Sequence, residues 1–525
     1  MQIENTCKKC KIYRFSCPNG LSSGKLDLML PSVIKSVSAT HGMNVAYISP
    51  NGKEITYKEL DVISDEMAVW LTNKGISEGS VVGLSLPSCI EYIVSYLALA
   101  KIGAITAGIN PRFTSRERSK TLRTLDPNLV ISAKGYDDGV GDQYRKTLIT
   151  LNEEELIQNH RVTGGSPQPL EDDDDRPVCI CFTSGSSGNP KGALFANRQL
   201  RAISELDTGG SWGGGGHRYA STEFAHVGVM TKLPWLLATA GTTHLIQKWN
   251  AREILQLIHE YKMSSVSAIA PQVALMLKQD GIEDLDFTSV KAIVTGGAYA
   301  SINLIKKGRE IFGAPWSVRY SSTESGGIGL GTSLTADDYE ALHTIGRPRE
   351  GVAAKICSPS GAELPTGEIG EIWISSPAVM SCYWNDPEET TKVFDQQWLK
   401  TGDLAYQTPE GYFILAGRTT EMYIRGGYNV YPLEVEGIFS EHPSIAEVVI
   451  IPRPDDIMGE IGVAVIVLED GCSPITIEDL RSFGLDKLAT YKLPEEVIYV
   501  ESIPRNTTDK IDRRELKETV KTRSG

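Results

Sequence analysis

A loop from Thr183 to Lys191 carries the residue types that hold phosphate groups. It reads T-S-G-S-S-G-N-P-K and directly follows the apolar run VCICF. Glycines let consecutive backbone N–H groups converge on an anion, hydroxyls add donors, and the lysine adds positive charge. The Walker A loop instead needs its lysine directly after the second glycine, so this loop predicts a different phosphate chemistry. The candidate phosphate ligands are Thr183, Ser184, Gly185, Ser186, Ser187, Gly188 and Lys191.

A second segment, YSSTESGG from Tyr320 to Gly327, also follows a strand-like run. Thr323 offers a hydroxyl, and Glu324 offers a carboxylate of the kind that Mg²⁺ prefers when it bridges phosphates. Taken alone, the segment is also compatible with a polar turn.

Two further segments carry charged residues near hairpin or turn signals. Asp403 and Arg418 flank the turn sequence of TGDLAYQTPEGYFILAGR, and a carboxylate can accept both hydroxyls of a ribose. Lys510 lies in a turn between two charged stretches. Taken alone, the first pair is also compatible with a surface ion pair, and Lys510 with a solvated lysine.

The elements that must position these residues alternate between strands and helices over the first 350 or so residues. The β-branched runs VVGLSL, LVIS, VCICF and KAIVTGG end near glycine or serine, which predicts parallel sheets covered by helices, with ligands at the carboxyl ends of the strands. Short strands and turns from Gly351 to Leu415 predict a β-rich subdomain. The segments AEVVIIPR and GVAVIVLE and a helix from Thr476 predict a small C-terminal unit.

Composition narrows the class of partner. The 525 residues include 52 basic and 66 acidic side chains, a net charge of −14, which disfavours nucleic acid and anionic membranes as partners. The apolar stretch YIVSYLALAKIGAITAGI contains Lys101 and Gly103 and predicts a buried helix followed by a strand. Scattered cysteines predict reduced thiols and a cytoplasmic location. Cys7, Cys10 and Cys17 form a cluster for which an ordinary segment and a zinc site are the alternatives.

Together and in this order, the four segments resemble the adenylate-forming superfamily of acyl- and aryl-CoA synthetases, luciferases and peptide-synthetase adenylation domains. The resemblance runs from ITYKEL to KIDRREL and includes GRPREGVAAKI, YWNDPEETTKVF and GGYNVYPLEVE. It implies an α/β fold. A large N-terminal domain of parallel-type α/β sheets with a β-rich subdomain spans residues 1–418, and a small mobile α+β domain spans 419–525.

The resemblance implies ATP and Mg²⁺ as cofactors and gives each position a role. The Thr183–Lys191 loop holds the β- and γ-phosphates, Asp403 and Arg418 hold the ribose, and Lys510 bridges the substrate carboxylate and the α-phosphate. Thr323 contacts phosphate and Glu324 binds Mg²⁺. The residues implied to border the base and the α-phosphate are Gly296, Gly297, Ala298, Tyr320, Ser321 and Ser322.

In relatives the C-terminal domain rotates for the second half-reaction and opens a tunnel for a pantetheine thiol. Gly427 matches the segment that lines this tunnel, with a plain tight turn as the alternative. Thr420 occupies the hinge position where aspartate or lysine is usual, and Asp509 replaces the glycine common before the lysine, which puts the balance of the rotation in doubt.

The sequence defines less closely which carboxylic acid is activated and which acceptor receives the acyl group. His226 is expected to line the acyl pocket or to pack as an uncharged core histidine. Gly296 borders the pocket, and Gly326, Gly327 and Gly329 leave room for an aryl, cyclic or medium-length acyl group. Coenzyme A is the expected acceptor, since no carrier-protein domain is present, with a carrier-protein thiol or an amine as alternatives. A catalytically silent nucleotide-binding protein is a further alternative.

The Gly-rich segment 208–220 is expected to be a mobile loop, with or without a function.

Overall fold

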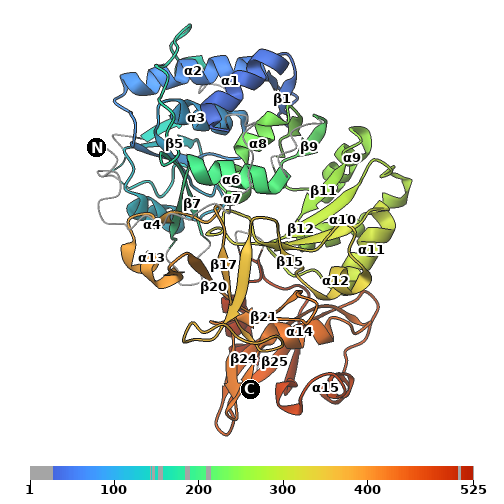
Figure 1. Cartoon of the computed structure of the whole chain (residues 1–525). Helices are drawn as coiled ribbons and strands as arrows, with labels where there is room; N and C mark the ends of the chain where they lie inside the picture. The colour runs from blue at the N-terminus through green and yellow to red at the C-terminus, as the bar shows by residue number, and fades with distance from the viewer. Residues whose placement is uncertain are drawn as a thin grey trace.

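The computed structural model describes residues 28–141, 144, 148–151, 158–183, 190–208, 215–246, 248–506 and 510–523. Four sheets and their helices form a large N-terminal part, and a fifth sheet forms a smaller C-terminal part below it in Figure 1. This arrangement confirms the predicted α/β fold with a large and a small domain.

A seven-stranded sheet forms the centre of the N-terminal domain. Its order is β18 (Cys382–Tyr383), β8 (Gly192–Ala196), β7 (Pro177–Phe182), β4 (Ile105–Gly108), β3 (Val81–Ser85), β5 (Leu129–Ala133), β6 (Leu148–Leu151). Strands β7 to β6 in this order pair in parallel, whereas β8 returns antiparallel to β7. The predicted phosphate loop is therefore the connection of a hairpin at one edge of the parallel strands.

The helices around this sheet are α1 (Leu30–His41), α2 (Tyr57–Asn73), α3 (Ile90–Lys101), α4 (Ser115–Leu125), α6 (Asn197–Thr208), α7 (Val227–Met230) and α8 (Leu233–Ala238). Helices α3, α4, α6 and α7 contact its strands, and α1, α2 and α8 pack against these helices. All residues of α3 except Ala100 are buried, and Lys101 is neutralised by Asp61 and Asp65 at 2.6 and 2.5 Å. The apolar stretch is thus a buried helix followed by β4, as predicted. No helix of the described residues has both the length and the apolar character needed to cross a membrane.

Two further sheets complete the α/β part. The smaller has the order β2 (Glu54–Thr56), β1 (Val45–Ile48), β10 (Thr242–His244), β9 (His217–Tyr219). The larger has the order β11 (Ser265–Ala268), β12 (Ala292–Gly296), β13 (Trp316–Tyr320), β14 (Leu330–Gly331), β15 (Arg347–Pro348). The accompanying helices are α9 (Ala251–Glu260), α10 (Ala270–Leu277), the 3₁₀ turn Ile282–Asp284, α11 (Ile302–Phe312) and α12 (Asp338–His343).

The predicted β-rich subdomain is an antiparallel sheet. It contains β16 (Ala353–Cys357), β17 (Gly370–Ser375), β20 (Trp398–Gln407), β19 (Phe394–Asp395) and β21 (Phe413–Arg418), and the helix α13 (Pro387–Val393) precedes β19. In the β20–β21 hairpin, Asp403 is directly opposite Arg418, so the pairing register itself brings the two charges together.

The C-terminal domain has a sheet of the order β23 (Tyr428–Val430), β22 (Tyr423–Arg425), β25 (Gly459–Leu468), β24 (Ile445–Asp455), with β26 (Glu496–Tyr499) beside β25. Its helices are α14 (Pro432–Phe439), α15 (Ile477–Leu485) and α16 (Arg513–Arg523), with a 3₁₀ turn at Thr490–Lys492. The two strands and the helix after Thr476 that the sequence predicts are β24, β25 and α15. The predicted domain boundary at 418/419 lies in the connection between β21 and β22.

The Gly-rich segment 208–220 differs in part from the expectation of a mobile loop. Residues 209–214 lie outside the described residues, but His217–Tyr219 form β9 and pair in parallel with β10. The end of the segment is therefore a strand, because an existing sheet edge supplies its hydrogen-bond partners.

The Cys7–Cys17 cluster lies outside the described residues. Each described cysteine has a free thiol.

Two helical glycines allow a test of packing. A Cβ at Gly308 of α11 would lie 2.4 Å from Cζ3 of the buried Trp316, whose Nε1 donates to Thr295 Oγ1 at 2.8 Å. We expect Gly308→Ala to lower the melting temperature, because overpacking costs about 1–3 kcal/mol and the helix-propensity gain is only about 1 kcal/mol. Gly437→Ala in α14 is the control, since its nearest neighbour is Tyr299 Oη at 4.0 Å. An unchanged melting temperature for Gly308→Ala would contradict this packing.

Candidate active site

A large cleft of about 2660 Å³ lies between the two domains and collects most of the predicted positions. On its N-terminal side, β12 and β13 run in parallel with Gly296 paired to Arg319, so the segments that follow them leave the sheet side by side. Gly297 adopts φ +76°, a conformation that favours glycine, and its added Cβ would meet only Ile269 within 4 Å. The predicted nucleotide residues that line the cleft are Thr183, Lys191, Gly297, Ala298, Tyr320, Ser321, Ser322, Thr323, Glu324, Asp403 and Arg418.

Asp403 is held from two directions. Tyr320 Oη donates to Asp403 Oδ2 at 2.6 Å, and Arg418 Nε donates to Asp403 Oδ1 at 2.6 Å. Burial and the adjacent Asp403 carboxylate raise the pKa of Tyr320 well above its usual value, so the phenol remains a donor. The arrangement fixes the position of the carboxylate at the edge of the cleft.

Glu324 lies in the turn after β13 and is also held in place. Tyr383 Oη donates to Glu324 Oε1 at 2.7 Å, and Met380 N donates to the Glu324 carbonyl at 2.8 Å. The described residues contain no group of three or more His, Cys, Asp or Glu side chains that could hold a metal alone. One carboxylate next to the Thr323 hydroxyl suits a Mg²⁺ ion that takes its other ligands from phosphate and water.

The phosphate loop is described only at its ends. Thr183 N donates to the Lys191 carbonyl at 2.9 Å, while Ser184, Gly185, Ser186, Ser187 and Gly188 lie outside the described residues. Lys191 forms an ion pair with Glu389 of α13, and its Nζ lies 5.2 Å from the centroid of the Tyr383 ring. The hydrogen bond from Lys191 lowers the pKa of Glu389 to about 2.

Sequence reasoning missed the roles of Tyr383 and Glu389. Both lie in YWNDPEETTKVF, which supported the resemblance without suggesting any contact. Tyr383 joins Lys191 to Glu324 through its ring and its hydroxyl, and Glu389 neutralises Lys191. The signal that could have revealed these roles was the presence of a tyrosine and a carboxylate in one segment that resembles the family.

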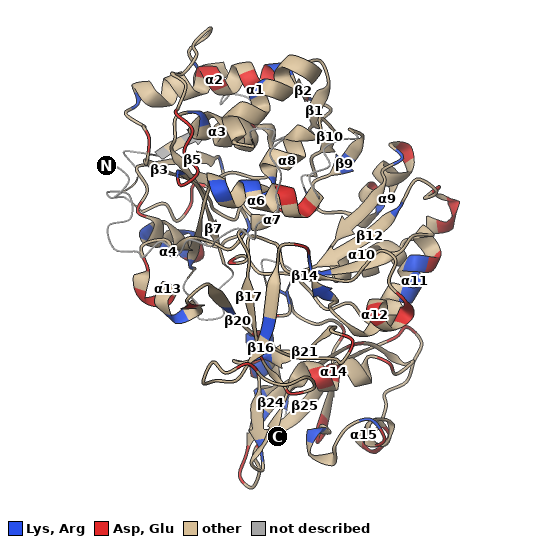
Figure 2. Ribbon diagram, in the orientation of Figure 1, with Lys and Arg blue, Asp and Glu red and all other residues tan. Residues whose placement is uncertain are grey.

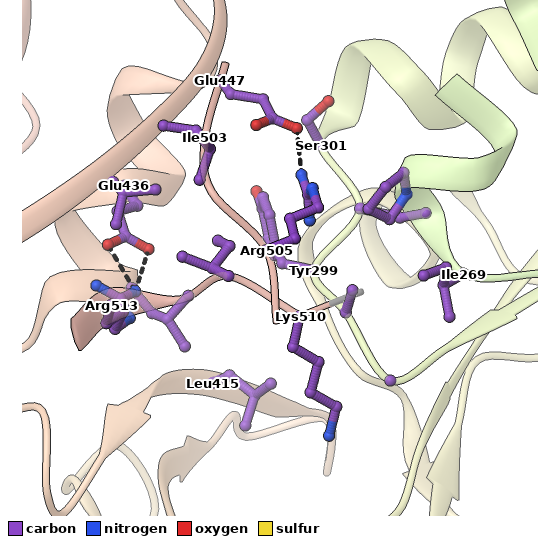
Figure 3. A pocket seen from close by; sticks show the side chains of 18 of the residues that line it. Ile269, Tyr299, Ser301, Leu415, Glu436, Glu447, Ile503, Arg505, Lys510 and Arg513 are labelled. Carbon is purple, nitrogen blue, oxygen red and sulfur yellow. Dashed lines mark hydrogen bonds and ion pairs between the residues drawn. The ribbon is translucent and has the colours of Figure 1, made fainter. Parts of the chain in front are cut away.

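Lys510 extends from the C-terminal domain past Leu415 into the cleft (Figure 3). Its loop is closed by reciprocal bonds with Asn506, from Asn506 N to the Lys510 carbonyl at 2.8 Å and from Lys510 N to Asn506 Oδ1 at 3.1 Å. Surrounding protein and the Arg418 guanidinium lower the pKa of Lys510, and the carboxylates of Asp403 and Glu324 oppose this shift. Lys510 is exposed and lines the same cleft as both of these carboxylates.

His226 does not pack as a core residue. It caps α7, its Nδ1 accepts a hydrogen bond from Gly228 N at 3.1 Å, and its ring is exposed. The surrounding protein, with smaller contributions from Lys510 and Lys232, lowers the pKa of His226 to about 4, so the ring is uncharged at neutral pH. Of the two expected environments, the core position is therefore wrong, and the acyl pocket stays a prediction.

The glycines after Glu324 differ from one another. A Cβ at Gly326 would lie 2.4 Å from the Ala378 carbonyl and 2.8 Å from Ile203 Cδ1, so the expectation that Gly326 leaves room for an acyl group is wrong. Gly326 is a glycine because the protein packs closely against it. A Cβ at Gly327 would meet only Lys232, at 3.4 Å from Cε, so the free space is at this position.

Gly427 lies apart from this constellation, whereas Thr420 lines the cleft. Gly426 and Gly427 form the two-residue connection between β22 and β23, with φ values of +55° and +87°. Within 4 Å nothing faces an added Cβ at Gly427, so in this domain arrangement it is an open turn. Thr420 is in the turn that leaves β21, where Thr419 N donates to the Gly402 carbonyl at 2.9 Å.

Comparisons with known proteins agree with this geometry. The AMP-binding enzyme family matches residues 34–384, and the AMP-binding enzyme C-terminal domain matches residues 434–510. A fatty acid–[acyl-carrier-protein] ligase, ScoC, from Streptomyces coeruleorubidus is 29% identical over 500 residues, with 92% of this chain and 95% of that protein covered. The indoleacetate–CoA ligase of Aromatoleum aromaticum is 27% identical over 495 residues, with 89% and 94% covered.

Two solved structures share the fold over nearly the full chain. The amide bond synthetase McbA from Marinactinospora thermotolerans superposes with a TM-score of 0.83 at 26% identity, covering 93% of this chain and 99% of that one. ATP-bound MatB from Rhodopseudomonas palustris gives a TM-score of 0.84 at 24% identity, covering 94% and 99%, which shows the common fold. The chain therefore belongs to the AMP-binding enzyme family and is an adenylate-forming, ATP-dependent carboxylate ligase related to acyl-CoA synthetases.

Proposed function

We propose that this ligase converts an aryl, cyclic or medium-length carboxylic acid to an acyl-adenylate and then transfers the acyl group to coenzyme A. The observation that carries the proposal is the convergence of Glu324, Asp403, Arg418 and Lys510 on one cleft, although Lys510 comes from a different domain. A cytoplasmic location belongs to the proposal and is supported by the free thiols of the described cysteines.

In the first half-reaction, a carboxylate oxygen forms a bond to the α-phosphorus as the bond to the β-phosphate breaks and pyrophosphate leaves. A carboxylate is a weak nucleophile facing a polyanion, so one cation in contact with both reduces repulsion and fixes their approach. Lys510 takes this role. Asp403 accepts the ribose hydroxyls with Arg418 as its support, and Tyr320 and Gly297 border the base. Magnesium, when bound at Glu324, supplies charge neutralisation.

In the second half-reaction, a nucleophile attacks the carbonyl carbon of the mixed anhydride and AMP leaves. Coenzyme A is favoured as its source because several similar proteins are CoA ligases, including those for indoleacetate and long-chain fatty acids. ScoC uses an acyl-carrier protein and McbA forms amide bonds, so these two acceptors are the alternative outcomes of the test. Rotation near Thr420 would withdraw Lys510 and bring the Gly427 turn to the cleft.

The role of Lys510 can be tested with the two half-reactions separated. We expect Lys510→Ala to lose ATP–pyrophosphate exchange by several orders of magnitude, because the carboxylate and phosphate charges are no longer bridged. It should still bind ATP and retain much of its thioester formation from pre-made acyl-adenylate. Lys521→Ala, an exposed lysine on α16 near Glu518, is the control. Equal loss of both half-reactions would show that Lys510 has a different role.

The ribose assignment predicts a specific effect on ATP. Asp403→Ala removes a charge-assisted acceptor worth roughly 1.5–3 kcal/mol, so the KM for ATP should rise about ten- to a hundredfold. The matched control is Asp395→Ala, an exposed aspartate of the same sheet. Steady-state kinetics with ATP varied at saturating acid would make the comparison, and an unchanged KM for ATP would refute the assignment.

The acceptor can be tested at Gly427. Asn tolerates positive φ, so Gly427→Asn keeps the turn and adds a side chain at its tip. If a pantetheine arm passes this turn, transfer to coenzyme A should collapse while ATP–pyrophosphate exchange remains near that of the unaltered enzyme.

Gly471→Asn is the control for the acceptor test, because Gly471 also has positive φ, +80°, and no atom within 4 Å of an added Cβ. Mass spectrometry of the products with coenzyme A, holo-carrier protein or an amine identifies the acceptor. Full thioester formation by the Gly427→Asn enzyme would exclude the tunnel, and formation of amide alone would assign an amine acceptor.

A further inference from the structure

Arg319 is a basic residue next to the nucleotide site for which the proposed reaction has no use. It is the residue before Tyr320 on β13 and lines the cleft between the domains. Side chains alternate along a strand, and Tyr320 points to Asp403, so Arg319 faces the opposite side of the sheet, with Ser321. Among the described residues, no hydrogen bond or ion pair engages its guanidinium.

The neighbouring strand leaves space for this guanidinium. A Cβ at Gly331 of β14 would lie 2.4 Å from Arg319 Nη1 and 3.1 Å from its Cδ. Because Arg319 and Gly331 are paired in register, any other residue at position 331 would require the arginine to move. The guanidinium is therefore held against the backbone of β14 and not free in solvent.

The surroundings of Arg319 carry an excess of positive charge. Lys232 and Arg349 both pair with Asp207 at the end of α6, at 2.5 and 2.8 Å, and Arg349 Nη2 donates to the Leu206 carbonyl at 3.0 Å. Figure 2 shows acidic residues at the end of α6 and basic residues near β14. Among the described residues, Asp207 pairs with Lys232 and Arg349 and not with Arg319, so the third cation of the group has no carboxylate of its own.

Partial burial makes the excess of positive charge around Arg319 energetically unfavourable. The side chains of Lys232 and Arg349 are 20% and 17% exposed, and Asp207 is 10% exposed. Burial, followed by repulsion from Arg349, lowers the pKa of Arg319, and Asp207 only partly compensates. Unpaired charge in a desolvated position is unfavourable, so this cluster favours an additional anion.

The cluster borders the position where the acid is activated. Lys232 lies against Gly327, which follows Glu324 by three residues and is the glycine with free space beside it. Arg319 and Lys510 also line the same cleft. An acyl chain whose carboxylate is near Lys510 and which passes the Ser321–Gly327 turn would end near Arg319.

We propose that the acid substrate is a dicarboxylic acid whose second carboxylate binds Arg319, beside the Asp207–Lys232–Arg349 group. The inference rests on the proposed adenylation function and names its substrate class. The guanidinium can form paired hydrogen bonds with a carboxylate, and such charge-assisted pairs are strong and directional. A neutral acyl end at the same place would leave Arg319 desolvated and unpaired.

The test uses ATP–pyrophosphate exchange with acids matched in length. Each set contains a dicarboxylic acid, its monomethyl ester and the corresponding monocarboxylic acid, in straight-chain and aromatic series. We expect the enzyme to prefer the diacid over its monomethyl ester by about ten- to a hundredfold in kcat/KM, the range of a charged hydrogen bond.

Variants of Arg319 separate specificity from folding. Arg319→Met keeps the length of the side chain and removes its charge, so it should abolish the preference for the diacid, mainly through KM. Arg319→Lys should retain part of the preference. Arg309→Met, at a partly exposed arginine of α11 that pairs with Asp338, is the control and should match the unaltered enzyme. An unchanged KM for ATP in all variants would show that the nucleotide site is intact.

The outcomes distinguish this inference from the function on which it rests. If monocarboxylic acids support exchange as well as diacids and Arg319→Met changes neither, the substrate class is wrong and adenylation stands. Absence of exchange with every acid would contradict the proposed function and the inference with it. A reversed preference in Arg319→Met, with monoacids now favoured, would give the strongest support.

Discussion

The Asp403 carboxylate joins parts of the large domain that are distant in sequence. It accepts hydrogen bonds from Tyr320 at the end of a parallel α/β strand and from Arg418 across an antiparallel hairpin. The α/β sheet and the β-rich sheet are thereby fixed relative to one another at the edge of the cleft. The strand that ends at Arg418 leads directly to the C-terminal domain, so the same carboxylate also fixes the point from which that domain departs.

The charge at the cleft is opposite in sign to the net charge of the whole chain. The protein carries a net charge of −14, yet Lys510, Arg418, Lys191 and Arg319 all line the space between its domains. A positive region inside an acidic protein concentrates small anions while the outer surface repels large polyanions. This separation suits a ligase whose nucleotide and acid are both negatively charged.

Much of this organisation could be predicted from the sequence, because local patterns determine it. Alternating β-branched runs and helical segments predicted the parallel sheet, and the turn signals between Asp403 and Arg418 predicted the hairpin that pairs them. The resemblance predicted that Lys510 and Glu324 act together, and the structure places them in one cleft; their chemical roles remain predictions. The mobile-loop expectation for 208–220 failed at His217–Tyr219, because strand pairing with β10 depends on a distant segment.

Other features depended on tertiary contacts that no local pattern reveals. Gly326 and Gly327 are neighbours with the same residue type, but one faces the Ala378 carbonyl and the other faces open space beside Lys232. Tyr383 of β18 and Glu389 of α13 acquire their partners, Glu324 and Lys191, only when segments distant in sequence pack together. The group around Asp207 combines α6, α8 and the segment after β15, whose proximity cannot be derived from spacing.

The Lys191–Glu389 ion pair has a consequence for turnover. For the loop to hold phosphate as proposed, Lys191 must exchange its carboxylate partner for a phosphate oxygen. Both side chains are about a quarter exposed, 24% and 28%, and pairs of this kind contribute only about 0–1 kcal/mol, so little stability is lost when the pair opens. Under the proposed function, Glu389 would serve as a counter-ion that pairs with Lys191 again once pyrophosphate has left.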